Sequence, residues 1–297
     1  MHESLPSHGR YDFSPIVDRP RYAWPEGRRV ALYIACGVEH YAFGEGLTEN
    51  LVPGGAHPDV LNTSWREYGN RVGAWRLLDL FADHAAPLGI LLNSAVCDHA
   101  PSLVEACRKA GHELIAHGHS NSDTLAGMDD DAQAAYVRAV ANRIGEASGR
   151  RPLGWAGPWM AETLSTPDVL REQGYGYILD WCMDDQPVWM RTRSAPLLSI
   201  PYSQELNDSS AIIGRQVSAS DFADMIVDQF DEMVATAVDG RPVVMSLILH
   251  AFIMGQPFRL RQLRRALSHI LAPRPDVWIT RPGDIADHFR SLSSTIR

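Results

Sequence analysis

Ionisable side chains follow several strongly apolar segments of the chain, at the point where each segment ends. The carboxylate and imidazole groups among them are Glu39, His40, His117 and His250. General acid–base hydrolysis requires such groups facing one cleft, because one must activate water and another must protonate the leaving group. Each residue taken alone also has a structural interpretation, since titratable groups serve folding as well as catalysis. The convergence of several segment ends favours the catalytic interpretation.

The apolar segments are expected to be parallel strands. They are RVALYIAC (29–36), LGILLN (88–93), ELIA (113–116), YILDW (177–181), LLSIPY (197–202), PVVMSLIL (242–249) and DVWIT (276–280). They alternate with longer amphipathic segments, and this alternation predicts right-handed crossovers and a closed barrel. In a parallel barrel the C-terminal ends of the strands carry the chemistry. Glu39 and His40, His117, Asp184 and Asp185, and His250 follow four different strands and are therefore expected at one rim.

Helical patterns separate these strands. They cover residues 70–84, 101–110, 132–144, 166–173, 220–233 and 259–271. In the first, apolar residues at a spacing of three predict one buried face, made of Val72, Trp75, Leu78 and Phe81. Ser220 is the expected N-cap of the fifth helix. Gly44–Trp65 is expected to be a long irregular loop, and a loop of that length often has a function.

Composition excludes several classes of function. The chain has 297 residues, 45% hydrophobic and 21% charged, and its 27 Lys and Arg against 36 Asp and Glu give a net charge of −9. A diffuse acidic surface does not favour nucleic acid or an anionic membrane as a partner. The longest apolar run, 243–254, is shorter than the roughly 20 residues of a membrane span. We expect a polar N-terminal arm (1–20) followed by one catalytic barrel (21–297).

No secretory signal is visible at the N-terminus, which lacks a basic region followed by an apolar stretch. The four cysteines lack C-x-x-C spacing and are expected to be free thiols. These features predict a cytoplasmic protein that acts on a small-molecule substrate.

A metal site is an open alternative. Catalytic zinc takes three protein ligands and keeps one open position. His40 and His117 could supply two ligands, with Glu39 or Asn121 as the third, although an amide is a weak ligand for zinc. The expectation is either no required cofactor, or one divalent metal such as zinc held by His40, His117 and Asn121.

Several stretches of the chain resemble a known family. They are RPLGW (151–155), YILDWCMDDQPVW (177–189), IPYSQELND (200–208), ILHAFIMGQPFR (248–259) and VWITRPGDIADHF (277–289). In this order they are similar to the polysaccharide deacetylase superfamily (carbohydrate esterase family 4), and within it to the metal-independent allantoinases and cyclic imide hydrolases. The resemblance implies an α/β fold, a single distorted (β/α)7 barrel, and a homo-oligomer, commonly a tetramer.

The resemblance also implies roles for individual residues. Glu39 falls at the position of the general base, and His250 falls at that of the histidine that protonates the leaving group. His117 matches the first histidine of an H-x-x-x-H metal motif, whose second histidine is Asn121 here. His40 stands where true deacetylases have a metal-binding Asp and the allantoinase-like branch has Glu. The departure at Asn121 implies weaker zinc binding than in the family, and the residue at His40 matches neither branch.

Together these features predict hydrolysis of the carbon–nitrogen bond of a small cyclic amide, imide or ureide. The expected flat walls of the pocket are Trp155, Trp159 and Trp181, and plain core packing is the alternative for them. The residues expected to hold substrate polar groups or to orient the histidines are Asp184, Asp185 and Asn207, with loop hydrogen bonding as the alternative. Two other functions stay open, namely a metal-dependent deacetylase of a small N-acetylated sugar or amine, and an inactive barrel that binds a ligand or partner.

Overall fold

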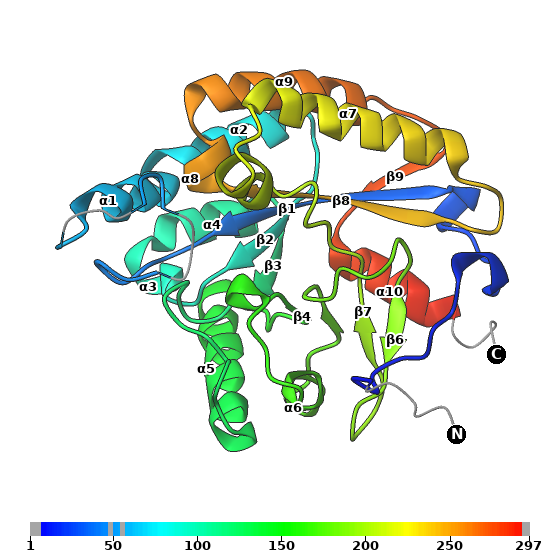
Figure 1. The fold of residues 1–297 in the computed structure, drawn as a ribbon, viewed down its shortest axis with the longest axis horizontal. Coiled ribbons are helices and arrows are strands. Elements are labelled where there is room, and N and C mark those ends of the chain that lie inside the picture. Colours follow the sequence, from blue (N-terminus) through cyan, green and yellow to red (C-terminus); the bar gives the residue numbers. More distant parts are fainter. Residues whose placement is uncertain (1–6, 47–49, 54–56, 293–297) are drawn as a thin grey trace.

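A curled sheet of nine strands is the frame of the molecule in the computed structural model, which describes residues 7–46, 50–53 and 57–292 (Figure 1). The strands are β1 (Val30–Val38), β2 (Gly89–Leu92), β3 (Glu113–Ala116), β4 (Gly154–Trp155), β5 (Tyr177–Ile178), β6 (Val188–Met190), β7 (Leu197–Ser199), β8 (Val243–His250) and β9 (Val277–Thr280). Their order is β6-β7-β5-β4-β3-β2-β1-β8, with β9 also on β1, and every pairing except β6–β7 is parallel. The crossovers are therefore those of an α/β fold.

The segment that follows β7 brings the sheet close to closure. Asn207 forms an isolated parallel bridge with Ile248 of β8. The backbone N–H of Ile248 donates to the carbonyl of Leu206 at 2.9 Å. The sheet is thus curled into a half-barrel, which is the distorted barrel expected from the sequence.

Ten helices cover the described part of the sheet and its ends. They are α1 (Val60–Tyr68), α2 (Ala74–Asp83), α3 (Val96–His99), α4 (Pro101–Lys109), α5 (Asp130–Ser148), α6 (Thr166–Glu172), α7 (Ala219–Thr236), α8 (Ala251–Met254), α9 (Pro257–Ile270) and α10 (Pro282–Leu292). Helices α7 and α9 lie side by side over β1 and β8 (Figure 1). Within the described ranges, none of these helices combines the length and the apolar character needed to cross a membrane.

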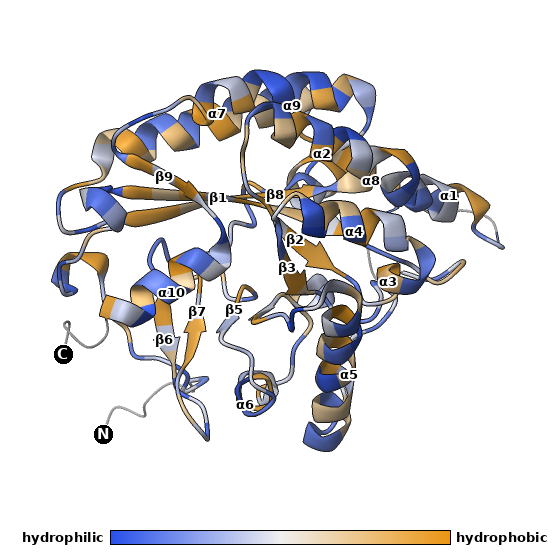
Figure 2. Cartoon of the chain, turned by 180° about the vertical axis from the view of Figure 1, so that it is seen from behind, coloured by the Kyte–Doolittle hydropathy of each residue, from blue (hydrophilic) through white to orange (hydrophobic). Residues whose placement is uncertain are grey.

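Strand β1 is buried on both faces, as a central parallel strand must be. Val30, Leu32, Ile34, Cys36 and Val38 pack in the core beneath the helices, whereas Ala31, Tyr33 and Ala35 pack in a second core inside the curl. The strands are accordingly apolar along their length, whereas polar and apolar residues alternate along α7 and α9 (Figure 2). Because side chains alternate along a strand, the inner row of β1 leads to Glu39.

Most predicted elements are confirmed. The strands expected over 29–36, 88–93, 113–116, 242–249 and 276–280 correspond to β1, β2, β3, β8 and β9. The helices expected over 101–110, 132–144, 166–173 and 259–271 correspond to α4, α5, α6 and α9. The strand expected over 177–181 is shorter, because β5 ends at Ile178. Strands β4 and β6, with two and three residues, were not predicted.

Three local predictions are wrong. The buried face of α2 is made of Ala74, Leu77, Leu80 and Phe81, because a strict spacing of three drifts off a helix of 3.6 residues per turn. The N-cap of α7 is Ser218 rather than Ser220, since the Ser218 hydroxyl accepts the N–H of Asp221 at 3.1 Å. The loop expected at Gly44–Trp65 already contains the start of α1, where Asp59 caps the N–H of Asn62 at 3.1 Å; residues 47–49 and 54–56 of that loop lie outside the described ranges.

Candidate active site

Glu39, His117 and His250 meet at the C-terminal ends of β1, β3 and β8. The Glu39 side chain is only 1% exposed, and its Oε1 lies 3.5 Å from Nε2 of both histidines. Within the described part of the chain this buried oxygen makes no conventional hydrogen bond. The prediction that these three residues share one rim is confirmed by their positions.

The register of the central strands sets this geometry. Gly37 of β1 pairs with His250 of β8, and Glu39 lies two residues further along the inner row. A Cβ atom added to Gly37 would lie 2.7 Å from Glu39 Oε1 and 3.2 Å from His250 Cδ2. The glycine therefore makes the space in which the carboxylate and the imidazole approach one another.

The two histidines have different partners at Nδ1. His117 Nδ1 lies 2.6 Å from the carbonyl oxygen of Ala156, so this nitrogen carries a proton. His250 Nδ1 lies 2.6 Å from Oδ1 of Asp208, whose Oδ2 accepts the His250 backbone N–H at 2.8 Å. Asp208 is fully buried. Both rings consequently turn Nε2 toward Glu39. Only His250 has a carboxylate at Nδ1.

Charge around Glu39 favours its ionised form. Burial alone would raise the pKa of Glu39, but the charges of His250 and His117 and the hydroxyl of Tyr41 outweigh burial and lower that pKa to about 2. Burial raises the pKa of Asp208, while His250 acts in the opposite direction. Glu39 is therefore a carboxylate at neutral pH, ready to accept a proton from water.

A polar network fixes the other oxygen of Glu39. The Tyr41 hydroxyl donates to Glu39 Oε2, and Asn121 Nδ2 donates to the Tyr41 oxygen at 3.3 Å. Asn93 Nδ2 in turn donates to Asn121 Oδ1 at 2.9 Å. Asn121 thus positions the carboxylate through Tyr41.

The structure does not bring His40 into the group around Glu39. As the residue after Glu39 it points to the other face of the sheet, where its ring stacks on His99 with centroids 3.9 Å apart. Burial lowers the pKa of His40, and the neighbouring His99 and His119 act in the same direction. The catalytic role expected for His40 therefore has no support in its position.

The predicted metal ligands do not fit a metal site. His40 faces away, and both amide groups of the Asn121–Asn93 pair are used within their own network. Of the expected trio, only His117 faces Glu39. No three His, Cys, Asp or Glu side chains of the described ranges are arranged to hold a metal ion.

The tryptophans expected as pocket walls have other environments. Trp155 is 0% exposed and packs in the helix-covered core against Tyr175, so core packing is the correct interpretation for it. Trp181 contacts Tyr11 of the N-terminal arm and donates from Nε1 to Glu162. Trp159, 44% exposed, lies just beyond β4 and stays a predicted contact with substrate.

Aromatic side chains that sequence reasoning did not select surround His250 instead. Phe252 lies 5.9 Å from the His250 ring and 6.0 Å from the Tyr41 ring, measured between centroids. Trp65 of α1 packs edge-on against Phe252 at 4.8 Å. Tyr41, Trp65 and Phe252 therefore form the apolar side of the candidate site.

Asp184, Asp185 and Asn207 have structural partners. Asp184 forms an ion pair with Arg19 of the N-terminal arm at 2.5 Å. The backbone carbonyl of Asp185, an exposed residue, accepts the N–H of Val244 at 2.8 Å. Asn207 accepts the N–H of Ser209 at 3.0 Å and bridges to β8. The direct substrate contacts expected for Asp184 and Asn207 are therefore replaced by fold contacts, and Asp185 stays a prediction.

Asp180 lies two residues after β5 and brings a further carboxyl group near the site. Its Oδ1 accepts the N–H of Gly157 at 2.7 Å, and His117 is among the groups that lower its pKa, although burial raises that pKa overall. Asp180 Oδ2 and Glu162 Oε1 are both buried without a hydrogen-bond donor among the described residues, and Asp180 adds to the effect of burial in raising the pKa of Glu162. Sequence reasoning selected Asp184 and Asp185 because it extended β5 by three residues.

Comparison with known proteins agrees with this geometry. Residues 65–178 match the family model described as polysaccharide deacetylase. The chain is 28% identical over 301 residues to a Schizosaccharomyces pombe protein named "Putative polysaccharide deacetylase", covering 92% of each. The solved structure of Puue allantoinase is 29% identical, with a TM-score of 0.77 over 92% of this chain and 94% of that one. A Pseudomonas aeruginosa PAO1 structure, titled "probable Polysaccharide deacetylase", is 28% identical, with a TM-score of 0.78 over 92% and 95%.

These likenesses extend over nearly the whole chain, and the buried Glu39 with its two histidines stands at the rim where a barrel of this kind carries its chemistry. Residues 65–178 match the polysaccharide deacetylase model, and nearly the whole chain is similar to proteins named for deacetylase or allantoinase activity.

Proposed function

We propose that the protein hydrolyses the carbon–nitrogen bond of a small cyclic amide, imide or ureide, with Glu39 as the base and His250 as the acid. The observation that carries this proposal is the buried Glu39 Oε1, 3.5 Å from Nε2 of both His117 and His250. The likeness to an allantoinase over 92% of the chain supports a cyclic ureide or imide as substrate.

The reaction begins with water. Glu39 takes one proton from a water molecule, and the resulting hydroxide adds to the carbonyl carbon of the substrate. His250 donates its Nε2 proton to the nitrogen as the carbon–nitrogen bond breaks. In a cyclic substrate the new carboxylate and the released nitrogen stay in one opened molecule, the nitrogen as an amine, an amide or a ureido group according to the ring.

Asp208 prepares His250 for this donation. Because Nδ1–H is already engaged by Asp208, the ring can donate from Nε2 only as an imidazolium, which the buried carboxylate stabilises. His117 has a carbonyl behind it and, when doubly protonated, its Nε2–H can stabilise the developing oxyanion. No step is assigned to a metal ion, because His40 and Asn121 do not join His117 in a ligand set.

A metal-dependent deacetylase is the second candidate. Its support is the name of the S. pombe relative, which is 28% identical over 92% of the chain. A ligand set for that chemistry would have to include His117 without His40. A homo-oligomer remains a proposal that follows from the resemblance, and a cytoplasmic location remains a proposal.

The decisive experiment compares substrates with and without a chelator. The native protein is incubated with a panel of cyclic imides and ureides and a panel of N-acetylated amines and sugars, and its bound metals are measured by elemental analysis. We expect ring opening of a cyclic substrate that persists in chelator. Activity only on N-acetyl compounds, abolished by chelator, would replace this proposal with the second candidate.

Glu39→Gln then separates catalysis from binding. We expect it to lower kcat about 10²–10⁴-fold, the usual contribution of a general base, while the substrate still binds. His40→Asn is the matched control and should keep kcat within about twofold, because its ring lies on the other face of the sheet. Equal loss in both variants contradicts the assignment, and absence of turnover in the native protein favours a binding protein.

A further inference from the structure

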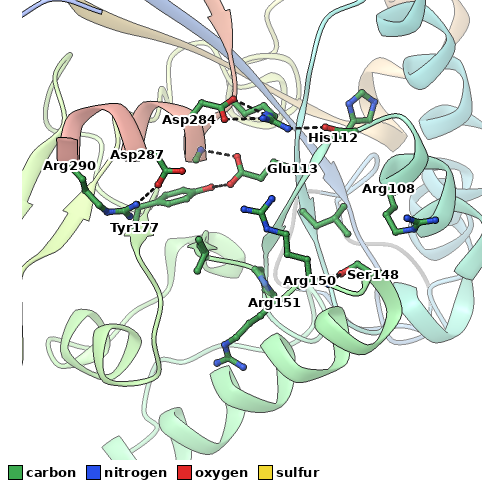
Figure 3. Close-up of a pocket in the computed structure, with 16 residues that line it drawn as sticks. Arg108, His112, Glu113, Ser148, Arg150, Arg151, Tyr177, Asp284, Asp287 and Arg290 are labelled. Atoms are coloured by element: carbon green, nitrogen blue, oxygen red, sulfur yellow. Dashed lines mark hydrogen bonds and ion pairs between the residues drawn. The ribbon is translucent and has the colours of Figure 1, made fainter. Parts of the chain in front are cut away.

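A second pocket lies at the opposite end of the barrel from Glu39. Its volume is about 320 Å³, within the range of small-molecule sites. Glu113 and Tyr177, the first residues of β3 and β5, lie in its wall together with the start of α10 (Figure 3). We name it the basal pocket, lined by Arg108, Glu113, Arg150, Arg151, Tyr177, Arg281 and Arg290 among others.

Five arginines line the basal pocket, although the whole chain carries a net charge of −9. Three of them pair with a carboxylate in the pocket wall or beside it, and two of these three, Arg281 and Arg108, do so through two hydrogen bonds each. Arg281 forms two hydrogen bonds with Asp284 at 2.8 and 2.9 Å, and Arg108 pairs with Glu105 at 2.6 Å. These two add little attraction for an anion.

The other arginines keep unused donors. Arg151 donates only to uncharged oxygens, at 2.8 Å to Asn142 and at 2.9 Å to Gln173. Arg290 pairs with Asp287 through Nη1 at 2.7 Å, but its buried Nη2 has no acceptor among the described residues. The Arg150 guanidinium forms no hydrogen bond or ion pair with any described residue, as Figure 3 shows for this region.

The one carboxyl group deep in the pocket does not neutralise them. Glu113 accepts the Tyr177 hydroxyl at 2.8 Å and the backbone N–H of Gly283 at 2.8 Å. Burial raises the pKa of Glu113, against the effect of these two hydrogen bonds. Its oxygens are thus engaged by neutral donors of the fold and not by an arginine, and Arg150 and Arg151 have no carboxylate partner among the described residues.

We propose that the basal pocket binds a small, multiply charged anion, either a phosphate ester or a polycarboxylate, through Arg150, Arg151 and Arg290. Guanidinium groups match the oxygen geometry of phosphate and carboxylate with two parallel hydrogen bonds. Leu114, Pro152 and Leu153 add an apolar wall for the carbon part of such a ligand. The site is separate from the chemistry at Glu39, which lies beyond the other end of the strands.

The test is calorimetric titration of the full chain with inorganic phosphate and with citrate, at constant ionic strength set by chloride. We expect saturable binding of one anion per chain by at least one of the two probes. A response to phosphate alone identifies a phosphate ester as the ligand class, and a response to citrate alone identifies a polycarboxylate. Failure of both probes to saturate would overturn the proposal.

Variants locate the binding. Arg150→Gln is expected to weaken binding at least tenfold without unfolding the protein, because this side chain is exposed and makes no contact that folding needs. Arg264→Gln is the matched control, an exposed arginine on α9 that pairs with Asp83 and lies outside the pocket. Equal binding by wild type and Arg150→Gln contradicts this location.

Discussion

Asp208 and Ala156 give the two histidines beside Glu39 different properties, although both rings lie at the same distance from the carboxylate. A buried carboxylate at Nδ1 stabilises an imidazolium far more than a carbonyl oxygen does. His250 is therefore the better proton donor, whereas the carbonyl at His117 Nδ1 supplies no negative charge. The chemical asymmetry of the site comes from residues that do not touch the substrate.

Asp208→Asn tests this asymmetry. The amide keeps a hydrogen bond to His250 Nδ1 but removes the charge, so we expect kcat to fall about 10²-fold or more, since acid catalysis at His250 is lost. The alkaline limb of the pH–rate profile should move to lower pH, because the imidazolium loses its stabilising charge. A profile that keeps its alkaline limb would assign the leaving-group proton to another residue.

The Glu162–Asp180 pair predicts an unusual dependence of stability on pH. Burial, followed by the charge of Asp180, raises the pKa of Glu162 to about 10. Between the unfolded pKa near 4.5 and this value, the folded protein holds a proton that the unfolded chain has released. The free energy of unfolding therefore falls as pH rises through this window.

Glu162→Gln should remove that dependence. We expect the melting temperature of wild type to decline from about pH 6 to about pH 9 more steeply than that of the variant. Glu146→Gln, at an exposed position on α5, is the control and should follow wild type. Parallel curves for wild type and Glu162→Gln would show that the two carboxyl groups do not share a proton.

The positions of side chains that end or directly follow an apolar strand could be predicted from the sequence. Glu39, His117 and His250 are of this kind. Prediction failed for Asp208, because that residue follows an irregular segment whose contact with β8 depends on the curl of the whole sheet. His40 was misplaced for a simpler reason: the alternation along β1 already assigns it to the face opposite Glu39.

At the scale of elements, the β1–β8 pair holds the site together, and Gly37 is its most sensitive point. A methyl group there would stand 2.7 Å from Glu39 Oε1, closer than atoms can approach. We expect Gly37→Ala to lower kcat about 10²-fold or more, because the carboxylate and His250 must separate. Overpacking should also destabilise the protein by about 1–3 kcal/mol, measured by chemical denaturation.

Gly145→Ala is the control for this substitution. It lies on α5, where the nearest atom to an added Cβ is 3.6 Å away, an ordinary contact. Activity should be unchanged and stability equal or slightly higher, since alanine favours a helix. If Gly37→Ala retains full activity, the close approach of Glu39 and His250 is not needed for catalysis.

Long apolar strands, and helices with clear start and stop residues, were predictable from the sequence. Elements of two or three residues were not. β4 and β6 are too brief to show a periodic pattern. The part of the fold that carries the candidate site was therefore predicted better than the β6 edge of the sheet, because the two longest strands, β1 and β8, lead to Glu39 and His250.

At the scale of the whole molecule, exposed apolar side chains gather around the long loop before α1. They are Phe43, Leu51, Val52, Val60 and Leu61, each at least 45% exposed. Such residues near one another favour an interaction surface over solvent. We therefore expect the homo-oligomer that the family resemblance implies to use this region, next to the rim that carries Glu39.

Light scattering after size-exclusion chromatography tests this expectation. Wild type should have a mass that is a multiple of 32.9 kDa, and the double variant Val60→Asp, Leu61→Asp should shift to smaller species. Leu164→Asp, 77% exposed at a different place, is the control. A monomeric wild type would contradict the expectation.

The N-terminal arm has a consequence for solubility. Its Arg10 carbonyl accepts the backbone N–H of Arg191 at 2.7 Å directly after β6, while Arg10 and Arg19 form ion pairs with Asp168 and Asp184. Strand β6 ends the sheet, and an open strand edge is a template on which another chain can add its own strand. Because the arm is hydrogen-bonded directly beyond β6 and anchored there by two ion pairs, we expect its removal to make addition of another chain's strand at this edge easier (Figure 1).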